Sequence, residues 1–537
     1  MAPLTNSEST STPGPWRPLK NALFRGLLIS GLVSDIGAFM QSVGAAWLMT
    51  SLTSNPFYIA LIQTASALPF FLLALPAGSI ADIFDRRKLL LGAEAWMFVM
   101  AVVLTGASIA KWMTPWLLLV LTLGLSMGDA TEAPAWRAIF PDLVSKDDLP
   151  AALALNGVEF NLARAVGPGL GGFVVAVVGV SATFGFNAVS FLGVFAVLLR
   201  WKAPARTTGK VPTESFRGAM SAAVRYVRYS PGIRVLLLRS AILIFFTSSF
   251  WALLPTAAKA LSRSPIAYGL LLGFFGTGAV LGAALLQRIR SRLSTERLLS
   301  VSTTVFAAVI LGLAVLHSPT VLCLLMLIGG ASWTTLMSIF NIMVQELAPD
   351  WVRARVLAVY LFVFQGSVAL GSTLWGYVAL RTDIHAALTI SGVGAGACLL
   401  LPALLKLPNT AVDLSSWNHW VQPSMLEEPA PDQGPVLVIV KYVIDPAKAE
   451  EFLHQMYGYQ RVRRRDGAIS WGIFVDTETP DVYLESFKVD SWAEHERQHE
   501  RFTKADREIE QRVLGFALKP VEVKHYIYAP EPETERS

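Results

Sequence analysis

Long apolar segments alternate with short polar connections from residue 20 to residue 406 of this chain. Their approximate spans are 23–50, 56–80, 88–110, 114–139, 149–179, 181–200, 235–258, 265–287, 297–316, 320–346, 352–379 and 385–406. An α-helix needs about 20 apolar residues to cross the hydrocarbon core, and every segment is at least that long. Backbone in lipid must satisfy its own hydrogen bonds. The pattern therefore predicts an all-α polytopic membrane part with 12 transmembrane helices.

Positive charges are distributed unevenly between the connections. Of 29 Lys and Arg residues up to residue 410, 24 lie in or beside connections on one side of the membrane, and Arg164 lies inside a segment. The four on the other side are Lys111, Lys259, Arg263 and Arg381. Because basic connections face the cytoplasm, we expect a multi-pass protein of the cell (inner) membrane with cytoplasmic N- and C-termini.

The longest connection, about 200–239, is basic and divides the segments into two sets of six. Its part 216–229 is predicted to be an amphipathic helix on the membrane surface. The run 140–144 (FPDLV) returns as 348–352 (APDWV), 208 positions later, each time between two long apolar segments. A duplicated six-helix unit is typical of a two-lobed transporter whose site lies between the lobes.

The last part of the chain has a different composition. Residues 1–410 carry a net charge of +13 and residues 411–537 carry −8, so the latter form a separate, water-soluble part. The expected divisions are a disordered tail (1–19), a six-helix lobe (20–204), a central loop (205–234), a second lobe (235–408), a linker (409–434), a folded domain (435–530) and a short tail (531–537).

Apolar alternation and charge pattern predict secondary structure in the folded domain. Strands are expected over 436–444, 469–476, 482–489 and 521–528, and helices over 446–465 and 491–516. This βαββαβ order predicts a small α+β domain with a ferredoxin-like fold.

Ionisable side chains inside apolar segments are candidates for function, since burying a charge in a membrane is costly. The candidates for the proton and substrate pathway are Asp35, Asp129, Glu132, Glu159 and Arg164. We expect Glu159 or Asp35 to carry a proton. Arg164 is expected either to change the proton affinity of that carboxylate or to bind an anionic substrate. The alternative is a fixed ion pair between Arg164 and a carboxylate on another helix. Glu94 and Glu346 lie near segment ends, where solvated side chains or contacts between the lobes are expected.

Two short motifs add to this picture. The connection 78–88 (GSIADIFDRRK) places Asp82 and Arg86 four residues apart, on one face if the helix continues that far. The run 167–172 (GPGLGG) follows a stripe of mostly small residues, which lets another backbone approach closely, and Pro168 is expected to bend the helix.

These motifs resemble those of major facilitator superfamily transporters, most closely the enterobactin-exporter-like, transmembrane secretion effector group. The first resembles the signature loop, with Asp85 in place of its second glycine. The resemblance implies a cytoplasmic latch between the lobes made by Gly78, Asp82, Asp85, Arg86 and Arg87, although the basic residues could also be topology anchors alone. The second matches the antiporter motif, Gly167, Pro168, Gly171 and Gly172, which is associated with export; ordinary close packing is the alternative. Residues 123–129 lack the arginine motif usual in drug–proton antiporters.

The resemblance implies a secondary active exporter of small organic molecules, siderophores or drug-like compounds, by proton antiport and alternating access. An uptake transporter is one alternative, and a transporter fused to a working enzyme domain is another. The expected partners are a small organic substrate, protons and membrane lipid, with no nucleic acid, cofactor or metal. The sequence contains no GxxxxGK[ST] loop, which argues against an ATP-driven pump.

The C-terminal domain resembles the antibiotic biosynthesis monooxygenase group of dimeric α/β barrels, on its element order and the run 491–499 (SWAEHERQH). The resemblance implies a candidate pocket of Trp471, Tyr483, His495 and His499 and a homodimer through this domain. His495 and His499 also match the HExxH zinc pattern, but no suitably placed third ligand is expected. We favour a domain that dimerises the transporter or senses its cargo, with these side chains packing the helix on the sheet.

Overall fold

The computed structural model describes residues 14, 16–83, 85–201, 216–408, 413–417 and 429–529, without the side chains of residues 74–83, 216, 217 and 219. Its internal contacts divide the chain into two compact units. Unit 1 comprises Met1–Lys210, Arg239–Ile339 and Leu361–Leu404, and unit 2 comprises Val211–Leu238, Phe340–Tyr360 and Leu405–Ser537. Most of the predicted disordered tail, residues 205–215 of the central loop, most of the linker and the tail 531–537 lie outside the described residues, whereas the end of the predicted disordered tail enters a short 3-10 helix.

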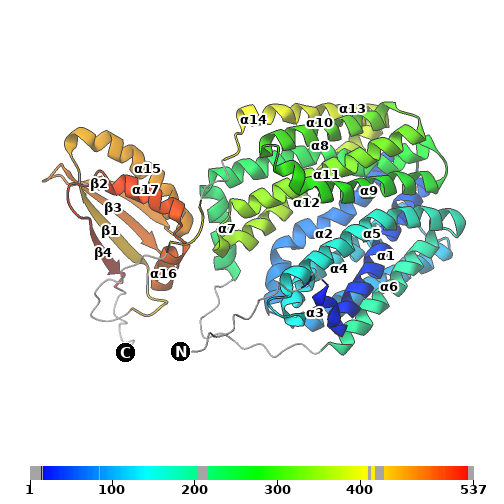
Figure 1. Cartoon of the computed structure of the whole chain (residues 1–537), viewed down its shortest axis with the longest axis horizontal. Helices are drawn as coiled ribbons and strands as arrows, with labels where there is room; N and C mark the ends of the chain where they lie inside the picture. The colour runs from blue at the N-terminus through cyan, green and yellow to red at the C-terminus, as the bar shows by residue number, and fades with distance from the viewer. Residues whose placement is uncertain are drawn as a thin grey trace, which may run out of the picture. The chain divides into compact units, whose positions relative to one another are not determined.

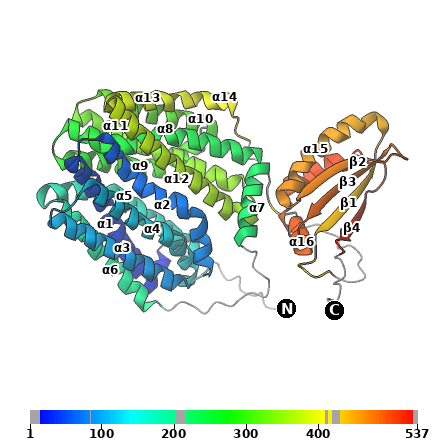
Figure 2. The ribbon, with the colours of Figure 1, turned by 180° about the vertical axis from the view of Figure 1, so that it is seen from behind.

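Long helices make up the membrane part (Figures 1 and 2). The first six, after the short η1 (Arg17–Lys20), are α1 (Ala22–Leu52), α2 (Pro56–Ile83), α3 (Arg86–Ile109), α4 (Pro115–Leu143), α5 (Leu149–Val177) and α6 (Val180–Arg200). The second six are α8 (Pro231–Leu261), α9 (Pro265–Arg290), α10 (Thr295–Val315), α11 (Pro319–Glu346), α12 (Asp350–Arg381) and α13 (Ile384–Ala397), which continues through η2 (Cys398–Leu400) into α14 (Leu401–Leu404). Among the described residues, 12 helices are long and apolar enough to cross a membrane, as predicted.

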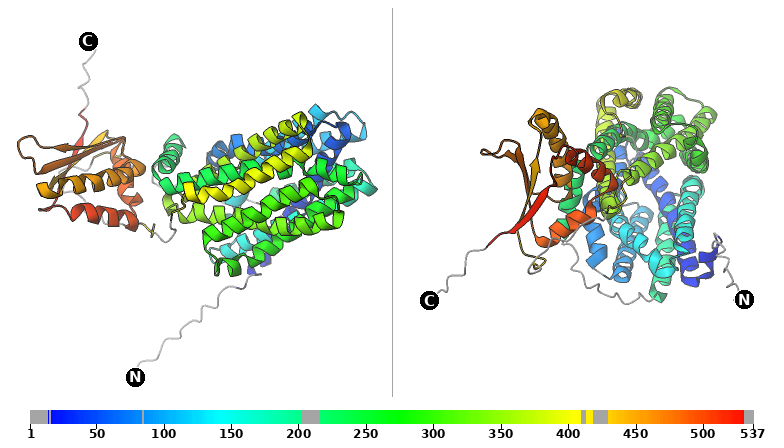
Figure 3. Two further views of the ribbon diagram at one scale, coloured as in Figure 1. Left: turned by 90° about the horizontal axis from the view of Figure 1, so that it is seen from above. Right: turned by 60° about the vertical axis from the view of Figure 1, so that its left-hand side comes forward.

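The surface of these helices is apolar, as lipid contact requires. Val158 is 64% exposed, Val189 66% and Leu370 68%. Leaving large apolar side chains exposed to water would be costly, whereas lipid tails solvate them. The helices of unit 1 run side by side (Figure 3). We call the end of the bundle where α1 begins and α14 ends the terminal face, and the other end the opposite face.

The two lobes contact each other along two helix pairs in the half of unit 1 nearer the opposite face. Where α5 meets α9, a Cβ built on Gly172 would lie 2.7 Å from the Cα of Gly269. Where α2 meets α12, the hydroxyl oxygens of Thr64 and Thr373 are 3.0 Å apart. Small residues at both crossings allow this close approach of helix backbones.

Two further contacts tie the lobes together. The rings of Phe71 (α2) and Phe362 (α12) stack with centroids 4.3 Å apart, close to the middle of both helices. At the opposite face, the Lys259 ammonium of α8 donates to the Thr50 carbonyl in the last turn of α1. A cation at a helix C-terminus is favoured by the helix dipole. The two lobes are therefore in close contact in the half of the bundle near the opposite face.

The C-terminal part of unit 2 is a four-stranded antiparallel sheet in the order β2-β3-β1-β4. The strands are β1 (Val436–Val443), β2 (Ser470–Val475), β3 (Val482–Val489) and β4 (Glu522–Ile527). The helices are α15 (Ala449–Asp466), which follows η3 (Pro446–Lys448), α16 (Trp492–Arg501) and α17 (Lys504–Leu514). This strand order with βαββαβ connections is a ferredoxin-like fold, as predicted.

One face of the sheet carries all three helices (Figure 1). Burial alternates along β1, and its buried positions join Phe452 and Tyr459 of α15 and Trp492 of α16 in one core. On the uncovered face, Phe474 remains 58% exposed and Tyr526 48% exposed. An alternating strand pattern of this kind is typical of a sheet with one packed face.

The predicted long helix 491–516 is wrong, because the chain breaks at Phe502–Thr503 into α16 and α17. Thr503 accepts a hydrogen bond from the Asp506 backbone N–H, and the Asp506 carboxylate accepts from the Thr503 backbone N–H. This reciprocal capping box starts a new helix at Lys504.

Candidate functional site

Asp35 and Glu159 form a carboxyl pair inside the first lobe. The side chain of Asp35 on α1 hydrogen-bonds to that of Glu159 on α5. Gly31, one turn before Asp35, faces the same carboxyl group, since a Cβ built on it would lie 3.9 Å from Glu159 Oε1. Glu159 is 7% exposed and its Oε1 has no hydrogen-bond donor. The pair therefore lies at a buried junction of α1 and α5.

The predicted glycine stripe of α5 makes this junction possible. Gly167 packs against Phe39 and Ile36, and a Cβ built on Gly171 would lie 2.8 Å from the Cα of Met40. These contacts bring the backbones of α1 and α5 together along the face that carries Glu159. Gly172 faces α9 instead, so the motif packs against both lobes.

Arg164 lies beyond the carboxyl pair on α5 and is half-buried. Its guanidinium carbon is 5.1 Å from the centre of the Phe160 ring, and its charge interacts with that of Asp35. No ion pair within 4 Å involves Arg164 among the residues that the structure describes. The fixed ion pair that the sequence left open is thus not observed, and Arg164 is a cation held near Asp35 by an aromatic ring.

Asp129 and Glu132 lie on α4, half-buried, and each interacts electrostatically with Asp35. Glu94 of α3 belongs to the same group, which the sequence did not predict. The expectation of a solvated Glu94 near a helix end is wrong, because its side chain is 2% exposed. A signal was present in the sequence: Leu90, Glu94, Met97 and Ala101 recur at the spacing of one buried helix face.

The structure places the basic residues of the 78–88 motif within the first lobe. Arg86 donates to the Ala138 carbonyl over 2.8 Å and pairs with Asp142 over 3.2 Å. Arg87 donates to the carbonyls of Leu198 and Leu199 at the end of α6. These arginines thereby satisfy helix C-terminal carbonyls, which favour cations.

The acidic part of this motif is only partly described. Asp85 caps α3, because its carboxylate accepts the backbone N–H groups of Arg87 and Lys88. Gly78 and Asp82 lie in α2, but the side chain of Asp82 is outside the described part of the chain.

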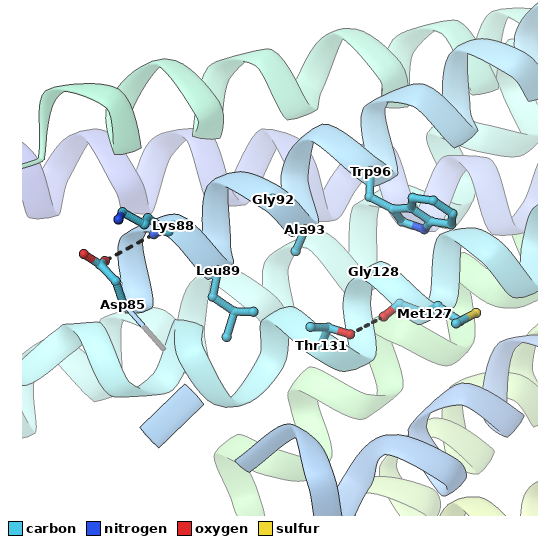
Figure 4. Close-up of a pocket in the computed structure, with 9 residues that line it drawn as sticks. All are labelled: Asp85, Lys88, Leu89, Gly92, Ala93, Trp96, Met127, Gly128 and Thr131. Atoms are coloured by element: carbon cyan, nitrogen blue, oxygen red, sulfur yellow. Dashed lines mark hydrogen bonds between the residues drawn. The ribbon is translucent and has the colours of Figure 1, made fainter. Parts of the chain in front are cut away.

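A groove of about 500 Å³ follows the outer side of α3 and α4. Figure 4 shows that its lining comes from the two helices and is mostly apolar, with Asp85 and Lys88 at one end and Trp96 and Met127 at the other. None of the five candidate pathway residues lines this groove.

The four candidate pocket residues of the C-terminal domain have different partners. The rings of His495 and His499 have centroids 4.8 Å apart, and His525 of β4 lies 4.8 Å from His495. Trp471 instead donates to the buried carboxylate of Glu485 over 2.9 Å. Tyr483 is 6% exposed and packs on Phe452, so its ring belongs to the core.

The histidines are held neutral by burial. Burial, with the charges of neighbouring histidines and Arg463, lowers the pKa of His495 to about 3 and that of His499 to about 4. Among the described residues, no group of three or more His, Cys, Asp or Glu side chains could hold a metal ion. The HExxH pattern therefore gives a packed histidine cluster here.

Unit 2 also contains α7 (Phe216–Tyr229), which occupies the range predicted for the amphipathic helix. The Tyr226 hydroxyl donates to the Leu347 carbonyl, over 2.9 Å, in the connection between α11 and α12. The guanidinium of Arg465 lies over the Tyr226 ring at 5.6 Å. Burial raises the pKa of Tyr226 to about 12, so the hydroxyl keeps its proton. Tyr226 thus joins α15 to the α11–α12 connection.

The C-terminal domain makes two further contacts of the same kind. The Arg501 guanidinium lies over the Trp351 ring at the start of α12, at 4.8 Å. Arg225 of α7 donates to the Arg465 carbonyl over 3.2 Å and also contacts Glu494. The domain is therefore bound to α7 and to the ends of α11 and α12 through arginine–aromatic and arginine–carboxylate contacts.

Two six-helix lobes, packed through small residues around intramembrane carboxyls, define a membrane transporter of the major facilitator type. The chain is similar to the staphyloferrin A transporter of Staphylococcus aureus, with 22% identity over 73% of this chain and 98% of that protein. It is 24% identical to the multidrug efflux pump Tap of Mycolicibacterium fortuitum over 67% of this chain and 90% of that protein. It is 25% identical to the enterobactin exporter EntS of Citrobacter koseri over 77% of this chain and 96% of that protein.

Solved structures show the same fold at lower identity. A bacterial homolog of the human lysosomal transporter Spinster, inward-facing and unoccupied, has a TM-score of 0.56 and 16% identity, over 72% of this chain and 96% of that chain. The nucleoside transporter NupG has a TM-score of 0.54 and 14% identity, over 72% of this chain and 99% of that chain. This chain belongs to the transmembrane secretion effector family, whose pattern it matches over residues 13–533.

Proposed function

We propose that this protein is a secondary active exporter that moves small organic molecules out of the cytoplasm in exchange for protons. The carboxyl pair of Asp35 and Glu159 carries the proposal. Two carboxylates at hydrogen-bonding distance in a low-dielectric medium repel each other, so the pair binds one proton between them. A proton bound there and released on the other side of the membrane would drive transport.

Alternating access would follow from the packing of the lobes. The α5–α9 and α2–α12 contacts close the half near the opposite face. If the basic connections face the cytoplasm, the terminal face is cytoplasmic and the observed state is closed to the outside. Rocking the lobes would break the contacts of Gly172 and Gly269 and expose the carboxyl pair to the exterior, where it would take up a proton.

The charge of the cargo would decide which side chains bind it. The names of the relatives, a staphyloferrin A transporter, an enterobactin exporter and a multidrug efflux pump, support a siderophore or a drug-like compound. An anionic siderophore would bind to Arg164. A cationic drug would be met by Asp35 and Asp129, in competition with the proton.

Inside-out vesicles with an acid interior test the proposal. A pH-quenched dye reports proton loss while siderophores and cationic drugs are added singly. We expect one compound to trigger proton release, and Glu159→Gln or Asp35→Asn to abolish the response. Uptake instead of export would appear as cargo movement in the other direction. An intact gradient that no compound in the panel dissipates would contradict proton-driven export.

For the C-terminal domain we propose control of transport. Its contacts with α7 and with the α11–α12 connection support this role, because α11 and α12 are transport helices. Trp471 is held by the Glu485 carboxylate and Tyr483 packs on Phe452, which argues against the alternative of a monooxygenase site. Full-length protein that oxidises a cargo compound in the presence of oxygen would restore that alternative.

The same domain is proposed to form a homodimer. The uncovered sheet face carries Phe474 and Tyr526 and is the surface that the dimeric α/β barrels pair through. Mass photometry of the full-length protein in nanodiscs would detect the dimer, and Phe474→Lys would dissociate it. A monomer at micromolar concentration would contradict it.

A further inference from the structure

A second pair of carboxyl groups lies between α3 and α4. Glu94 and Glu132 hydrogen-bond through their side chains. The packing of the two antiparallel helices explains the register: a Cβ built on Gly128 would be 2.3 Å from Met97 Cγ. One turn further along both helices brings Glu94 opposite Glu132.

This pair is deep inside the first lobe. Glu94 lies about 12 Å along the axis of α3 from its first residue, Arg86, at a rise of about 1.5 Å per residue. Its side chain is 2% exposed, and its Oε2 is buried without a hydrogen-bond donor. An unsatisfied buried carboxylate oxygen carries the desolvation penalty of a charged group with no hydrogen bond to offset it.

The described side chains that act electrostatically on Glu94 are acidic. The side chains that interact with it electrostatically are Asp129, Asp35 and Glu132, and the same group acts on Glu132. Arg164 interacts with Asp35 and not with this pair in the described part of the chain. In the described part of the chain, therefore, no cation acts on Glu94 and Glu132 to stabilise two negative charges there.

A proton resolves both problems. An ionised carboxylate only accepts hydrogen bonds, whereas a protonated one also donates, so a single proton between Glu94 and Glu132 satisfies the buried oxygen and removes one charge. A metal ion would need more ligands than these side chains supply, and no such group occurs among the described residues.

We propose that Glu94 and Glu132 form a second proton-binding site, separate from Asp35 and Glu159. Asp129 interacts electrostatically with a member of each pair, Asp35 and Glu94. On the proposed function, this site adds a second proton to each transport cycle, so that export of a neutral molecule carries two positive charges inward.

Carbodiimide labelling tests the site without any cargo. Dicyclohexylcarbodiimide reacts with a protonated carboxyl in an apolar environment: the carboxyl proton moves to a carbodiimide nitrogen, an oxygen bonds to its central carbon, and rearrangement leaves a stable N-acylurea. Full-length protein in nanodiscs is treated at pH 6, 7.5 and 9, and labelled peptides are counted by mass spectrometry. We expect at least tenfold more label on the Glu94 or Glu132 peptide at pH 7.5 than on Glu346, which is exposed, and a decline at pH 9.

Two variants separate the sites. In Glu94→Gln the amide donates to Glu132 and stabilises its ionised form, so labelling of Glu132 at pH 7.5 should fall severalfold. In Asp35→Asn/Glu159→Gln the label on Glu94 or Glu132 should persist. Two results would overturn the inference. One is a wild-type sample in which Asp35 or Glu159 is labelled but neither Glu94 nor Glu132 is. The other is loss of the label on Glu94 and Glu132 in Asp35→Asn/Glu159→Gln. Because the assay needs no transport, a failed export assay leaves this result interpretable.

Discussion

Arg225 of α7 donates from Nη2 to Glu494 Oε1 of α16 over 2.9 Å, with the two side chains 20% and 10% exposed. Arg501 binds the same carboxylate over 2.6 Å and the Asp466 carbonyl over 2.6 Å. Burial alone would raise the pKa of Glu494, but the hydrogen bond and charge of Arg501 and the charge of Arg225 lower it. The carboxylate is thus a permanent anion shared by the C-terminal domain and the central-loop helix.

Arg225→Ala should loosen the domain from α7 without unfolding it, because Glu494 keeps Arg501 and Arg497. Losing one hydrogen bond to a charged group costs about 1.5–3 kcal/mol. Amide exchange at the end of α15 and in the first turn of α16 should therefore accelerate roughly tenfold or more. Hydrogen-exchange mass spectrometry of the full-length protein measures this change.

Arg228→Ala is the matched control, since Arg228 lies on the same helix but is exposed over Tyr229. It should leave exchange in the domain unchanged. Equal exchange in both variants would show that the Arg225–Glu494 contact does not hold the domain.

Gly172→Ala should keep the lobes apart at the opposite face. A Cβ at this position would lie 2.7 Å from the Cα of Gly269 and 3.0 Å from the Pro265 carbonyl oxygen. Overpacking against backbone costs about 1–3 kcal/mol, which would shift the equilibrium roughly 5- to 150-fold away from the closed state. Maleimide labelling of a Thr64→Cys reporter, with Cys323 and Cys398 replaced by alanine, should become faster.

Gly169→Ala, three residues away on the same helix, is the control, because a Cβ there meets nothing within 4 Å. Its labelling rate should match that of the parent protein. A Gly172→Ala rate equal to the parent would mean that the α5–α9 contact does not limit opening.

Arg463→Met should destabilise the C-terminal domain severely. Glu485 is 0% exposed and receives hydrogen bonds from Arg463, Tyr442 and Trp471. Removing the arginine leaves a buried charge without its counter-ion, a change that costs about 3–5 kcal/mol. Urea-dependent proteolysis of the domain in the full-length protein should show the loss, whereas Arg461→Met on the exposed side of α15 should not.

The sequence was informative where one pattern has one structural meaning. Apolar length predicted the twelve spans, and the amphipathic range 216–229 corresponds to α7. The sequence pattern was misleading about which face of a helix an ionisable side chain occupies. Glu94 looked solvated from its distance to the segment end, yet it shares the buried face of Leu90 and Met97. Pairing of Glu94 with Glu132 depends on the α3–α4 register, which no local pattern encodes.

The break between α16 and α17 has a local signal in the sequence. The run Thr503-Lys-Ala-Asp506 is a capping box, and it outweighs the continuous charged pattern on either side. The docking of Arg225 on Glu494 had no such signal, because it joins residues 269 positions apart.

Acid should destabilise the C-terminal domain through its histidine cluster. The folded-state pKa is about 3 for His495 and about 4 for His499, both below the ordinary value of 6.5. Between each folded-state pKa and 6.5, the unfolded chain binds more protons than the folded domain does. The contribution of the histidines to the free energy of unfolding is therefore complete above about pH 6.5. It falls as the pH drops, by about 1.4 kcal/mol per pH unit for each histidine. Pulse proteolysis of the full-length protein from pH 7.5 to 4.5 should release the domain at progressively lower urea. His495→Gln/His499→Gln should flatten that slope, while His454→Gln on the exposed surface of α15 should keep it; an unchanged slope in the double variant would assign the acid sensitivity to other groups.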